Sequence, residues 1–196
     1  MKVRESGMPE EHVWEDFFSP GTILKTMGVS SGIKDVAEFG CGYGTFTIPT
    51  AKMVSGKVYA LDIETEMIES TQRKAMNNRL RNVETILRDF MADGSGLDDE
   101  SVDYVMLFNI LHLEEPQTLL KEAHRILRPN GKLGIVHWNY DPATPRGPPM
   151  EIRPQPEQCI HWAEAVGFVF QQQKDLQPYH YGVLMIKTTD IPDWVI

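Results

Sequence analysis

The sequence lacks the usual features of secreted, membrane and nucleic-acid-binding proteins. Its two cysteines, Cys41 and Cys159, are too few for a disulfide framework or a zinc cluster. No apolar run approaches the ~20 residues that cross a bilayer, and the N-terminus leads into polar sequence rather than a signal peptide. The 19 Lys and Arg are outnumbered by 28 Asp and Glu, and the net charge of −9 disfavours phosphate backbones. We therefore expect a cytoplasmic enzyme or binding protein, with no membrane segment and no nucleic-acid partner.

The histidines also lack the spacing of a metal site. His12, His124, His161 and His180 are widely separated, and no His-Glu-x-x-His motif is present. We expect no bound metal.

The length and composition are those of one ordinary domain. Domains typically have ~100–200 residues, and this chain has 196, of which 41% are hydrophobic and 24% charged. Internal repeats and low-complexity stretches are absent. We expect a single domain over residues 1–196, with a helical N-terminal extension or lid (1–34) and a core (35–187).

Between residues 35 and 138, apolar runs that suit buried strands alternate with helical patterns. This alternation indicates an α/β protein with a buried parallel sheet. Pro129-Asn130-Gly131 predicts a turn before the fifth strand. The expected strands are residues 35–39, 57–62, 83–89, 102–109 and 132–138.

The helix after the first strand carries two predictions. Pro49 lacks an N–H group and is tolerated only in a first turn, so the helix should start no earlier than about Thr45. Gly56 suits a left-handed cap at the end of this helix.

The C-terminal part begins with a proline-dense stretch and ends in a predicted hairpin. Six prolines lie between Pro142 and Pro156, too many for a helix or a sheet, so the stretch should be stiff and extended. A helix over 156–166 should end at Gly167. The link between the last two strands, 168–174 and 180–187, is short enough for antiparallel pairing.

The N-terminal extension contains a helix signal and several aromatic residues. Ser19 and Pro20 form a suitable N-cap and first-turn pair for a short helix. Ahead of it lie Trp14, Phe17 and Phe18, which fit either a lid with a ring against a positive charge or a hydrophobic staple on the sheet edge.

The first predicted strand runs into the glycine-rich loop Gly40-Cys41-Gly42-Tyr43-Gly44, where glycines allow a tight turn and close approach to a ligand. A dinucleotide fingerprint needs a sixth-position glycine, where this chain has Thr45, and no Gly-Lys-Ser/Thr phosphate loop is present. Glu38, two residues before Gly40, would repel a pyrophosphate but suits a positively charged ligand. S-adenosylmethionine, which has a sulfonium, an ammonium and no phosphate, fits these constraints.

Residues 36–44 resemble motif I of the class I S-adenosylmethionine-dependent methyltransferases, an acidic residue followed by Gly-x-Gly-x-Gly, and match it without a gap. The resemblance continues in order and spacing to residue 138 and more loosely to residue 187. It implies that residues 35–187 are a catalytic core with a three-layer α/β sandwich fold. Its Rossmann-like, seven-stranded, mostly parallel sheet would have the order 3-2-1-4-5-7-6 and one antiparallel strand. The cofactor would lie at the carboxyl ends of the strands, where the strand order reverses.

The resemblance also implies which residues bind the cofactor. Asp62, 22 residues after Gly40, would hold the ribose, and Ile63 would pack on the adenine. Asp89 would receive the adenine amino group or merely begin the following turn. The full predicted set is Glu38, Gly40, Cys41, Gly42, Tyr43, Gly44, Asp62, Ile63, Asp89, Phe90 and Asn109.

The methyl acceptor is less well specified, because the sulfonium is already a good leaving group and the protein mainly aligns the acceptor and excludes water. No universal catalytic residue can be carried over, and His112 is the one candidate base. The predicted acceptor-side residues each have a structural alternative, as a cap, a core residue, a staple or a loop support. They are Trp14, Phe18, His112, Trp138, Arg146 and Arg153.

Several functions remain open at this point. Phe108-Asn109-Ile110-Leu111 does not match the Asn/Asp-Pro-Pro-aromatic motif of base-methylating enzymes, which together with the net charge disfavours methylation of adenine or cytosine. We expect a small-molecule acceptor before a protein one, and polymer substrates last. A non-catalytic binder of S-adenosylmethionine or S-adenosylhomocysteine, or a partner subunit, would keep the same cofactor residues. A nicotinamide-dependent reductase is disfavoured by Glu38 and Thr45.

Overall fold

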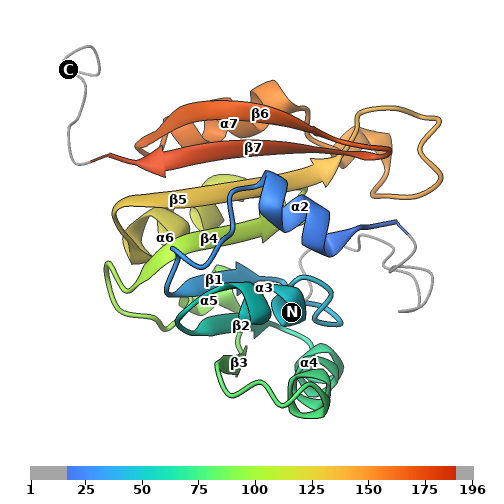
Figure 1. Cartoon of the computed structure of the whole chain (residues 1–196). Helices are drawn as coiled ribbons and strands as arrows, with labels where there is room; N and C mark the ends of the chain where they lie inside the picture. The colour runs from blue at the N-terminus through green and yellow to red at the C-terminus, as the bar shows by residue number, and fades with distance from the viewer. Residues whose placement is uncertain (1–16, 189–196) are drawn as a thin grey trace.

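The computed structural model describes residues 17–188, so Trp14 lies outside the described residues. Within this range the chain forms one seven-stranded sheet in the order β3-β2-β1-β4-β5-β7-β6, as predicted (Figure 1). The strands are β1 (Val36–Phe39), β2 (Val58–Asp62), β3 (Val83–Leu87), β4 (Val102–Phe108), β5 (Leu127–Trp138), β6 (Phe168–Leu176) and β7 (His180–Lys187). The helices are α2 (Pro20–Thr26), α3 (Thr47–Met53), α4 (Thr65–Asn77), α5 (Phe90–Asp93), α6 (Pro116–Ile126), η1 (Met150–Ile152, a 3-10 helix) and α7 (Pro156–Glu164).

Strand direction places the start of β7 at the edge of the sheet where the parallel strands end. Strands β3, β2, β1, β4 and β5 are mutually parallel, whereas β7 pairs antiparallel with both β5 and β6. Trp138 at the end of β5 is therefore opposite His180 at the start of β7, and His137 is opposite Tyr181. The predicted hairpin is confirmed, and its first residues lie beside the carboxyl ends of the parallel strands.

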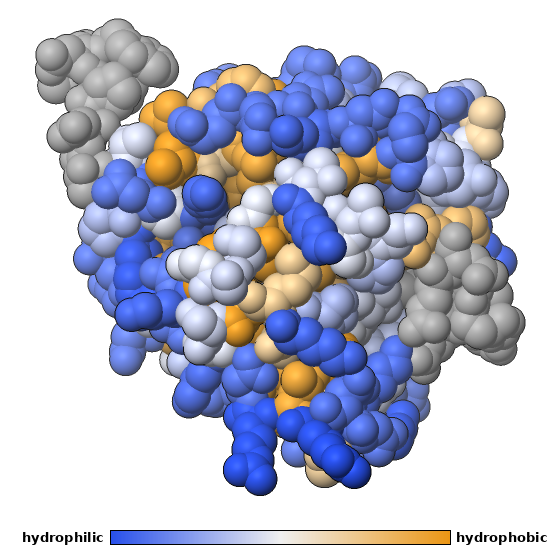
Figure 2. All heavy atoms as spheres, in the orientation of Figure 1, coloured by the Kyte–Doolittle hydropathy of each residue, from blue (hydrophilic) through white to orange (hydrophobic). Residues whose placement is uncertain are grey.

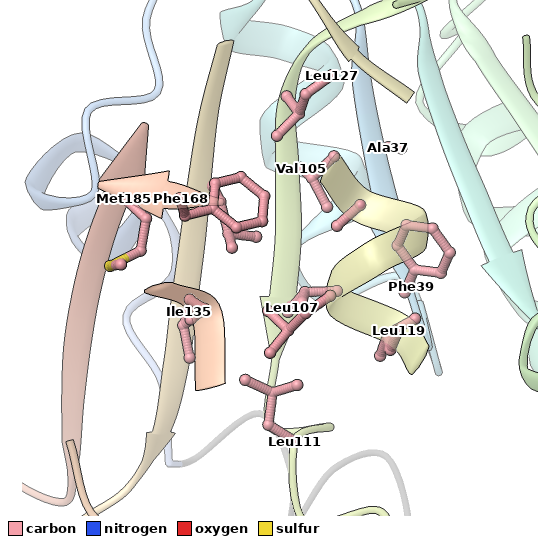
Figure 3. Close-up of a cluster of buried hydrophobic side chains, with 14 of the residues drawn as sticks. Ala37, Phe39, Val105, Leu107, Leu111, Leu119, Leu127, Ile135, Phe168 and Met185 are labelled. Atoms are coloured by element: carbon pink, nitrogen blue, oxygen red, sulfur yellow. The ribbon is translucent and has the colours of Figure 1, made fainter. Parts of the chain in front are cut away.

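Helices cover both faces of the sheet and give three layers (Figure 1). Apolar residues of α2 and α3 pack on one face, and those of α5, α6 and α7 pack on the other. Figure 3 shows side chains from β1, β4, β5 and α6 gathered in the larger of these clusters, among them Phe39, Leu107, Ile135 and Leu119. Alternate residues of each strand serve opposite faces, which explains why the strands read as continuous apolar runs.

The outer surface is mostly polar. Hydrophilic residues cover most of the face seen in Figure 2, and apolar residues show there in separate areas. None of the helices within residues 17–188 is both long and apolar enough to cross a bilayer.

Two local predictions were wrong, one for the turn at Pro129-Asn130-Gly131 and one for the helix cap at Gly56. Pro129-Asn130-Gly131 does not precede the fifth strand but lies inside β5, where a register irregularity opposite β4 accommodates the positive φ of 63° at Asn130. Gly56 is not a left-handed cap, since α3 already ends at Met53. A Cβ at Gly56 would lie 2.7 Å from the carbonyl carbon of Lys34, so close backbone approach explains this glycine.

The N-terminal segment is fastened to the sheet through a tyrosine. Helix α2 begins at Pro20 and packs Ile23 and Leu24 into the core, as its sequence predicts. The fully buried Tyr104 of β4 donates a hydrogen bond from its hydroxyl to the carbonyl of Met27 at 2.8 Å. A Cβ at Gly134 of β5 would lie 2.1 Å from this hydroxyl, so only glycine lets the ring pass.

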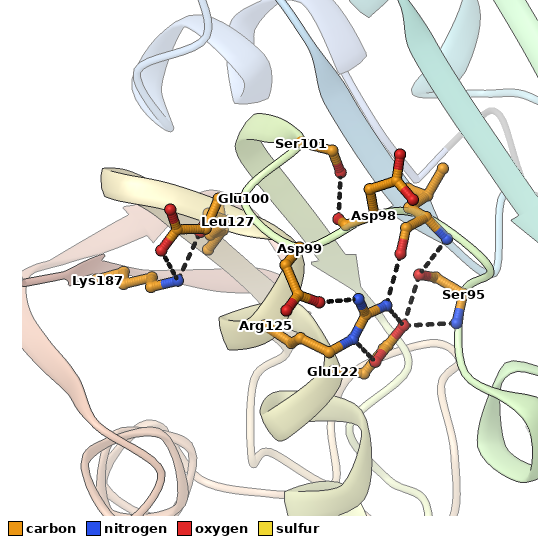
Figure 4. A network of polar contacts seen from close by, with 10 residues as sticks. Ser95, Asp98, Asp99, Glu100, Ser101, Glu122, Arg125, Leu127 and Lys187 are labelled. Atoms are coloured by element: carbon orange, nitrogen blue, oxygen red, sulfur yellow. Dashed lines mark hydrogen bonds and ion pairs between the residues drawn. The ribbon is translucent and has the colours of Figure 1, made fainter.

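A network of charged residues fixes the loop before β4 (Figure 4). Arg125 of α6 donates hydrogen bonds to Glu122, to Asp99 and to the carbonyl of Leu97, while Glu122 accepts from both the amide and the hydroxyl of Ser95. These bonds, foremost those from Arg125, lower the pKa of Glu122 to about 2. The carboxylates here are fully used in structural contacts, so this charged cluster supports the fold rather than a ligand.

Candidate functional site

The glycine-rich loop after β1 has a backbone that only glycine adopts readily. Gly40, Gly42 and Gly44 have φ angles of 72°, 53° and 77°, all in the left-handed region. The amides of Gly40 and Cys41 both donate to the carbonyl of Leu61 in β2, which anchors the loop to the neighbouring strand. The loop therefore lies over the carboxyl ends of β1 and β2, between strand and helix as predicted.

Two of these glycines are also required by their neighbours. A Cβ at Gly40 would lie 2.9 Å from Cδ1 of Ile110, and one at Gly44 would lie 2.9 Å from Oγ1 of Thr71. Thr71 of α4 is fully buried and donates a hydrogen bond to the carbonyl of Gly42 at 2.9 Å. Helix α4 thus holds the loop from the other side.

Glu38 lies beneath the loop in a buried position. Its side chain is 2% exposed, and it accepts a hydrogen bond from the hydroxyl of Thr47 at the start of α3 at 2.5 Å. Burial is the main cause that raises its pKa to about 8; the hydrogen bond from Thr47 opposes the shift, and the charge of Asp62 adds to it. No cation is paired with Glu38 within the described residues, so this carboxyl suits a positively charged ligand.

Asp62 connects two loops with one carboxylate. Its Oδ2 accepts from the amide of Gly42 at 2.9 Å, and its Oδ1 accepts from the amide of Glu64 at 3.0 Å. Burial raises the pKa of Asp62, while these hydrogen bonds oppose the rise. Each oxygen retains a second lone pair, which is what acceptance of two ribose hydroxyls requires.

The other predicted cofactor residues lie around this centre. Ile63 follows Asp62 and is half-buried, and Tyr43 is half-buried within the glycine loop. Phe90 is buried and packs edge-on against Phe39, with ring centroids 5.3 Å apart. Asp89 accepts a hydrogen bond from the amide of Ala92 as the N-cap of α5, so the turn-forming role is present whatever else it binds.

Cys41, inside the glycine-rich loop, is a buried structural residue rather than a nucleophile. Its side chain is 4% exposed, and burial is the main cause that raises the pKa of its thiol well above the usual range.

Two buried polar side chains next to the loop lack hydrogen-bond partners among residues 17–188. They are the hydroxyl of Thr45 and both amide atoms of Asn109, the residue that follows β4 with a φ of 55°. Buried polar groups are normally paired, so these atoms fit a polar ligand lying across the glycine loop and the end of β4. Together with the Glu38 and Asp62 carboxylates, this set fits S-adenosylmethionine.

On the far side of Asn109, buried histidines and aromatic rings gather at the ends of β5 and β7. The ring centroids of His112 and His137 are 5.7 Å apart, and those of Trp138 and His180 are 4.3 Å apart. Phe18 packs on Trp138 and His180, so this predicted acceptor-side residue is beside Trp138. The sequence places His137 with Trp138 at the end of the fifth strand, either beside the acceptor or in the core. Sequence reasoning did not group His180 with this region, although it begins β7.

Arg153 holds the proline-rich loop together. It is 6% exposed and makes six hydrogen bonds to that loop, five to carbonyls and one to the hydroxyl of Thr144. Its donors are thus engaged with the chain itself, which is the loop-supporting alternative considered above. Arg146 is exposed in the same loop. A contact of either arginine with an acceptor remains a prediction.

We expect Arg153→Lys to open the proline-rich loop, because one ammonium cannot reproduce a planar fork of donors. Unfolding free energy should fall by about 2–3 kcal/mol, since buried carbonyls lose their partners. Limited proteolysis should show faster cleavage between residues 139 and 155, while Arg146→Lys in the exposed position should leave cleavage unchanged. Equal cleavage of the Arg153→Lys and native proteins would contradict the assigned role.

Among residues 17–188, no three His, Cys, Asp or Glu side chains are arranged to hold a metal ion. The histidine cluster described above is surrounded by rings rather than by carboxylates.

Comparison with known proteins agrees with the site. A family described as "Methyltransferase domain" matches residues 36–131. The fold is similar to that of a SAM-dependent methyltransferase from Aquifex aeolicus, with a TM-score of 0.80, 28% identity, and coverage of 91% of this chain and 94% of that one.

Curated relatives match over part of their length. An uncharacterized 37.1 kDa protein in transposon TN4556 of Streptomyces fradiae is 31% identical over 77% of this chain and 46% of its own length. A demethylmenaquinone methyltransferase from Geobacillus sp. is 33% identical over 56% of this chain and 47% of its own length. The chain thus spans about half the length of these relatives.

Proposed function

The chain belongs to the class I S-adenosylmethionine-dependent methyltransferases, and from this membership we propose that it transfers a methyl group from S-adenosylmethionine to a small-molecule acceptor. The observation that carries the proposal is the buried carboxyl of Glu38, which has no cationic partner among residues 17–188 and lies beneath the glycine-rich loop. We retain the cytoplasm as its expected location.

The predicted cofactor residues would each contact a different part of the cofactor. The Asp62 carboxylate would hold the ribose, with Ile63 and Phe90 beside the adenine. Glu38, Thr45 and Asn109 would face the methionine portion, where Glu38 offers negative charge and the other two offer unpaired polar atoms. When bound, S-adenosylmethionine supplies an activated methyl group on a sulfonium centre.

In such a reaction the protein mainly positions the cofactor and the acceptor and excludes water. The rigid loop fixes the cofactor site, and the aromatic cluster of Phe18, Trp138 and His180 excludes water from the neighbouring end of the sheet. A small acceptor is supported by the similarity to a demethylmenaquinone methyltransferase and by the apolar character of this end of the sheet.

We expect Asp62→Asn to weaken S-adenosylmethionine binding by about tenfold, because an amide cannot accept from both loop amides and both ribose hydroxyls. Isothermal titration calorimetry measures this directly. Asp93→Asn, an exposed carboxyl in α5, is the matched control and should bind as the native protein does. An unchanged dissociation constant in Asp62→Asn would remove Asp62 from the ribose site.

The alternative of a non-catalytic binder or partner subunit shares the cofactor site and differs in turnover. Thermal melting with S-adenosylmethionine, S-adenosylhomocysteine and NADH tests binding, because only a ligand of the native state raises the melting temperature. Release of S-adenosylhomocysteine over a panel of acceptors then tests transfer. Binding without release from any acceptor would favour the alternative.

A further inference from the structure

The segment 109–112 joins the glycine loop to a pair of buried histidines. The Ile110 side chain lies so close to Gly40 that a Cβ there would come within 2.9 Å of Cδ1. Two residues further on, the ring of His112 meets that of His137 edge-on, with centroids 5.7 Å apart and an interplanar angle of 73°. The amide of Asn109 also donates to the carbonyl of Val136, immediately before His137. The histidine pair therefore lies beside the proposed cofactor site.

His137 is the least satisfied polar side chain of this region. It is 0% exposed, and neither ring nitrogen has a hydrogen-bond partner among residues 17–188. The ring of Tyr181 stacks on it at 6.4 Å, but the Tyr181 hydroxyl donates to the carbonyl of Pro154 and contacts the thiol of Cys159. Because buried polar groups are rarely left unpaired, His137 points to a polar group supplied by a ligand.

The ionisable side chains whose charges affect the pKa of His137 are all basic. Burial is the main cause that lowers the pKa of His137, and the charges of His112, His180 and Arg153 lower it further. Asp141 is the carboxylate that acts on Arg153, and it is exposed. His137 is therefore a neutral imidazole with one N–H to donate. The positive potential from these basic side chains opposes the binding of an ammonium group and favours a ligand oxygen that becomes negatively charged.

Buried apolar and aromatic residues adjoin the pair in sequence or by ring contact. Leu111, Trp138 and Tyr181 are 0%, 1% and 4% exposed. The ends of β4 and β5 and the start of β7 lie on one side of the molecule, together with the loop after β5 (Figure 1). A ligand reaching His137 from this side meets rings and aliphatic chains, which suits an apolar ring compound.

We propose that His112 and His137 form the oxygen-binding part of the acceptor site, and that the acceptor is an apolar molecule with an ionisable ring hydroxyl, a phenol or an enol. This rests on the proposed function. His137 donates a hydrogen bond to the acceptor oxygen, and His112 takes the hydroxyl proton. An electron pair of that oxygen forms the bond to the methyl carbon while the carbon–sulfur bond breaks and its pair stays on sulfur. His112 then returns the proton to water.

Binding of matched probes tests the proposal without turnover. Phenol and aniline, 1-naphthol and 1-naphthylamine, and 4-hydroxycoumarin and 4-aminocoumarin differ only in hydroxyl or amine. Each is titrated calorimetrically into protein saturated with S-adenosylhomocysteine. We expect at least one hydroxyl compound to bind about tenfold or more tightly than its amine partner, the scale of one hydrogen bond to a buried group.

Variants separate a binding role from a structural one. His137→Phe should abolish the hydroxyl preference, whereas His137→Gln, which keeps an N–H donor, should preserve most of it. His161→Asn, an exposed histidine on α7, is the matched control and should behave as the native protein does. A retained rise in melting temperature with S-adenosylhomocysteine shows that each variant is folded.

Turnover tests the proton-accepting role of His112. With the preferred hydroxyl compound, His112→Asn should lower kcat about 100-fold, as loss of a general base does, and added imidazole should restore part of it. The product should be a methyl ether. The proposal is overturned if no hydroxyl compound binds better than its amine, if His137→Phe keeps the preference, or if methyl appears on nitrogen. Failure of S-adenosylmethionine to bind at all would instead overturn the proposed function.

Discussion

Glu38→Gln should weaken S-adenosylmethionine binding about 100-fold at about pH 9 and should remove most of the pH dependence of that binding. The carboxyl is buried, accepts a hydrogen bond from Thr47 and has no cationic partner among residues 17–188. Glutamine keeps the shape and the acceptor for Thr47 but removes the negative charge. The cofactor's positive charge then has no counter-charge in a buried site, which is costly.

The sign of the pH effect follows from the raised pKa of Glu38, about 8 in the free protein. Below that value the carboxyl is mostly neutral, so a cation must first displace its proton. The dissociation constant of the native protein should therefore rise about tenfold per unit as pH falls below 8, and level off above it. At about pH 6 the native protein and Glu38→Gln should bind almost equally, since both then present a neutral side chain.

Calorimetry in buffers of different ionisation enthalpy measures the proton released on binding. The native protein should release about one proton at neutral pH in excess of Glu38→Gln. The cofactor's amino group and Asp62 titrate in both proteins, so the difference isolates Glu38. Equal proton release by the two proteins would refute the linkage.

The same carboxyl should destabilise the free protein in alkali. A folded pKa above the unfolded one means that its stabilising contribution is full at low pH and lost as pH rises through about 8. Without cofactor, Glu38→Gln should thus melt at a higher temperature than the native protein above that pH. The ionised carboxyl therefore lowers the stability of the free protein, although it strengthens cofactor binding.

Gly44→Ala should eliminate measurable S-adenosylmethionine binding. Gly44 has a φ of 77°, and an added Cβ would lie 2.9 Å from Oγ1 and 3.4 Å from Cα of Thr71. Either the loop or helix α4 must move, and both are needed to hold the cofactor loop in place. We also expect a loss of about 1–3 kcal/mol in unfolding free energy from backbone strain and steric overlap.

Two other glycines provide graded controls for this variant. Gly21 in α2 has no atom within 4 Å of a built Cβ and no positive φ, so Gly21→Ala should be neutral or slightly stabilising. Gly28 has the same φ of 77° but nothing within 4 Å, so Gly28→Ala measures the backbone cost alone. Normal cofactor binding by Gly44→Ala would show that the loop adapts and would contradict the fixed geometry described above.

The strands were predictable because each buried parallel strand leaves a continuous apolar run, and the short link before β7 favours antiparallel pairing. Their order in the sheet was predictable from the resemblance to the methyltransferase family. Local exceptions came from contacts distant in sequence. Gly56 looked like a helix cap because its constraint, the backbone of Lys34, is not visible in the local pattern. Asn130 looked like part of a turn, because a turn and a bulge use similar residues.

The positions of Glu38, the glycines and Asp62 at the strand ends could be predicted, since they occur at the spacings of the family motifs, and their contacts with the cofactor stay predictions. The residues that form hydrogen bonds with Glu38 and with the glycine-rich loop could not be predicted. Thr47 and Thr71 hold the site from helices, and nothing in their local sequence indicates it. His137 ends an apolar run and fits either the acceptor side or the core, and the pairing of β5 with β7 places it opposite Tyr181. Its ring also contacts that of His112.

The antiparallel return of β7 has a consequence for how such proteins diversify. The stretch that matches the family, residues 36–131, ends before His137, while the hairpin that completes this end of the sheet is encoded last. In the proposed site, Glu38 and Asp62 lie within the matched stretch, whereas the acceptor side includes Phe18 and His112 as well as His137 and the hairpin. Exchanging the part after residue 131 between relatives should therefore alter one portion of the acceptor side and leave these donor-binding residues unchanged.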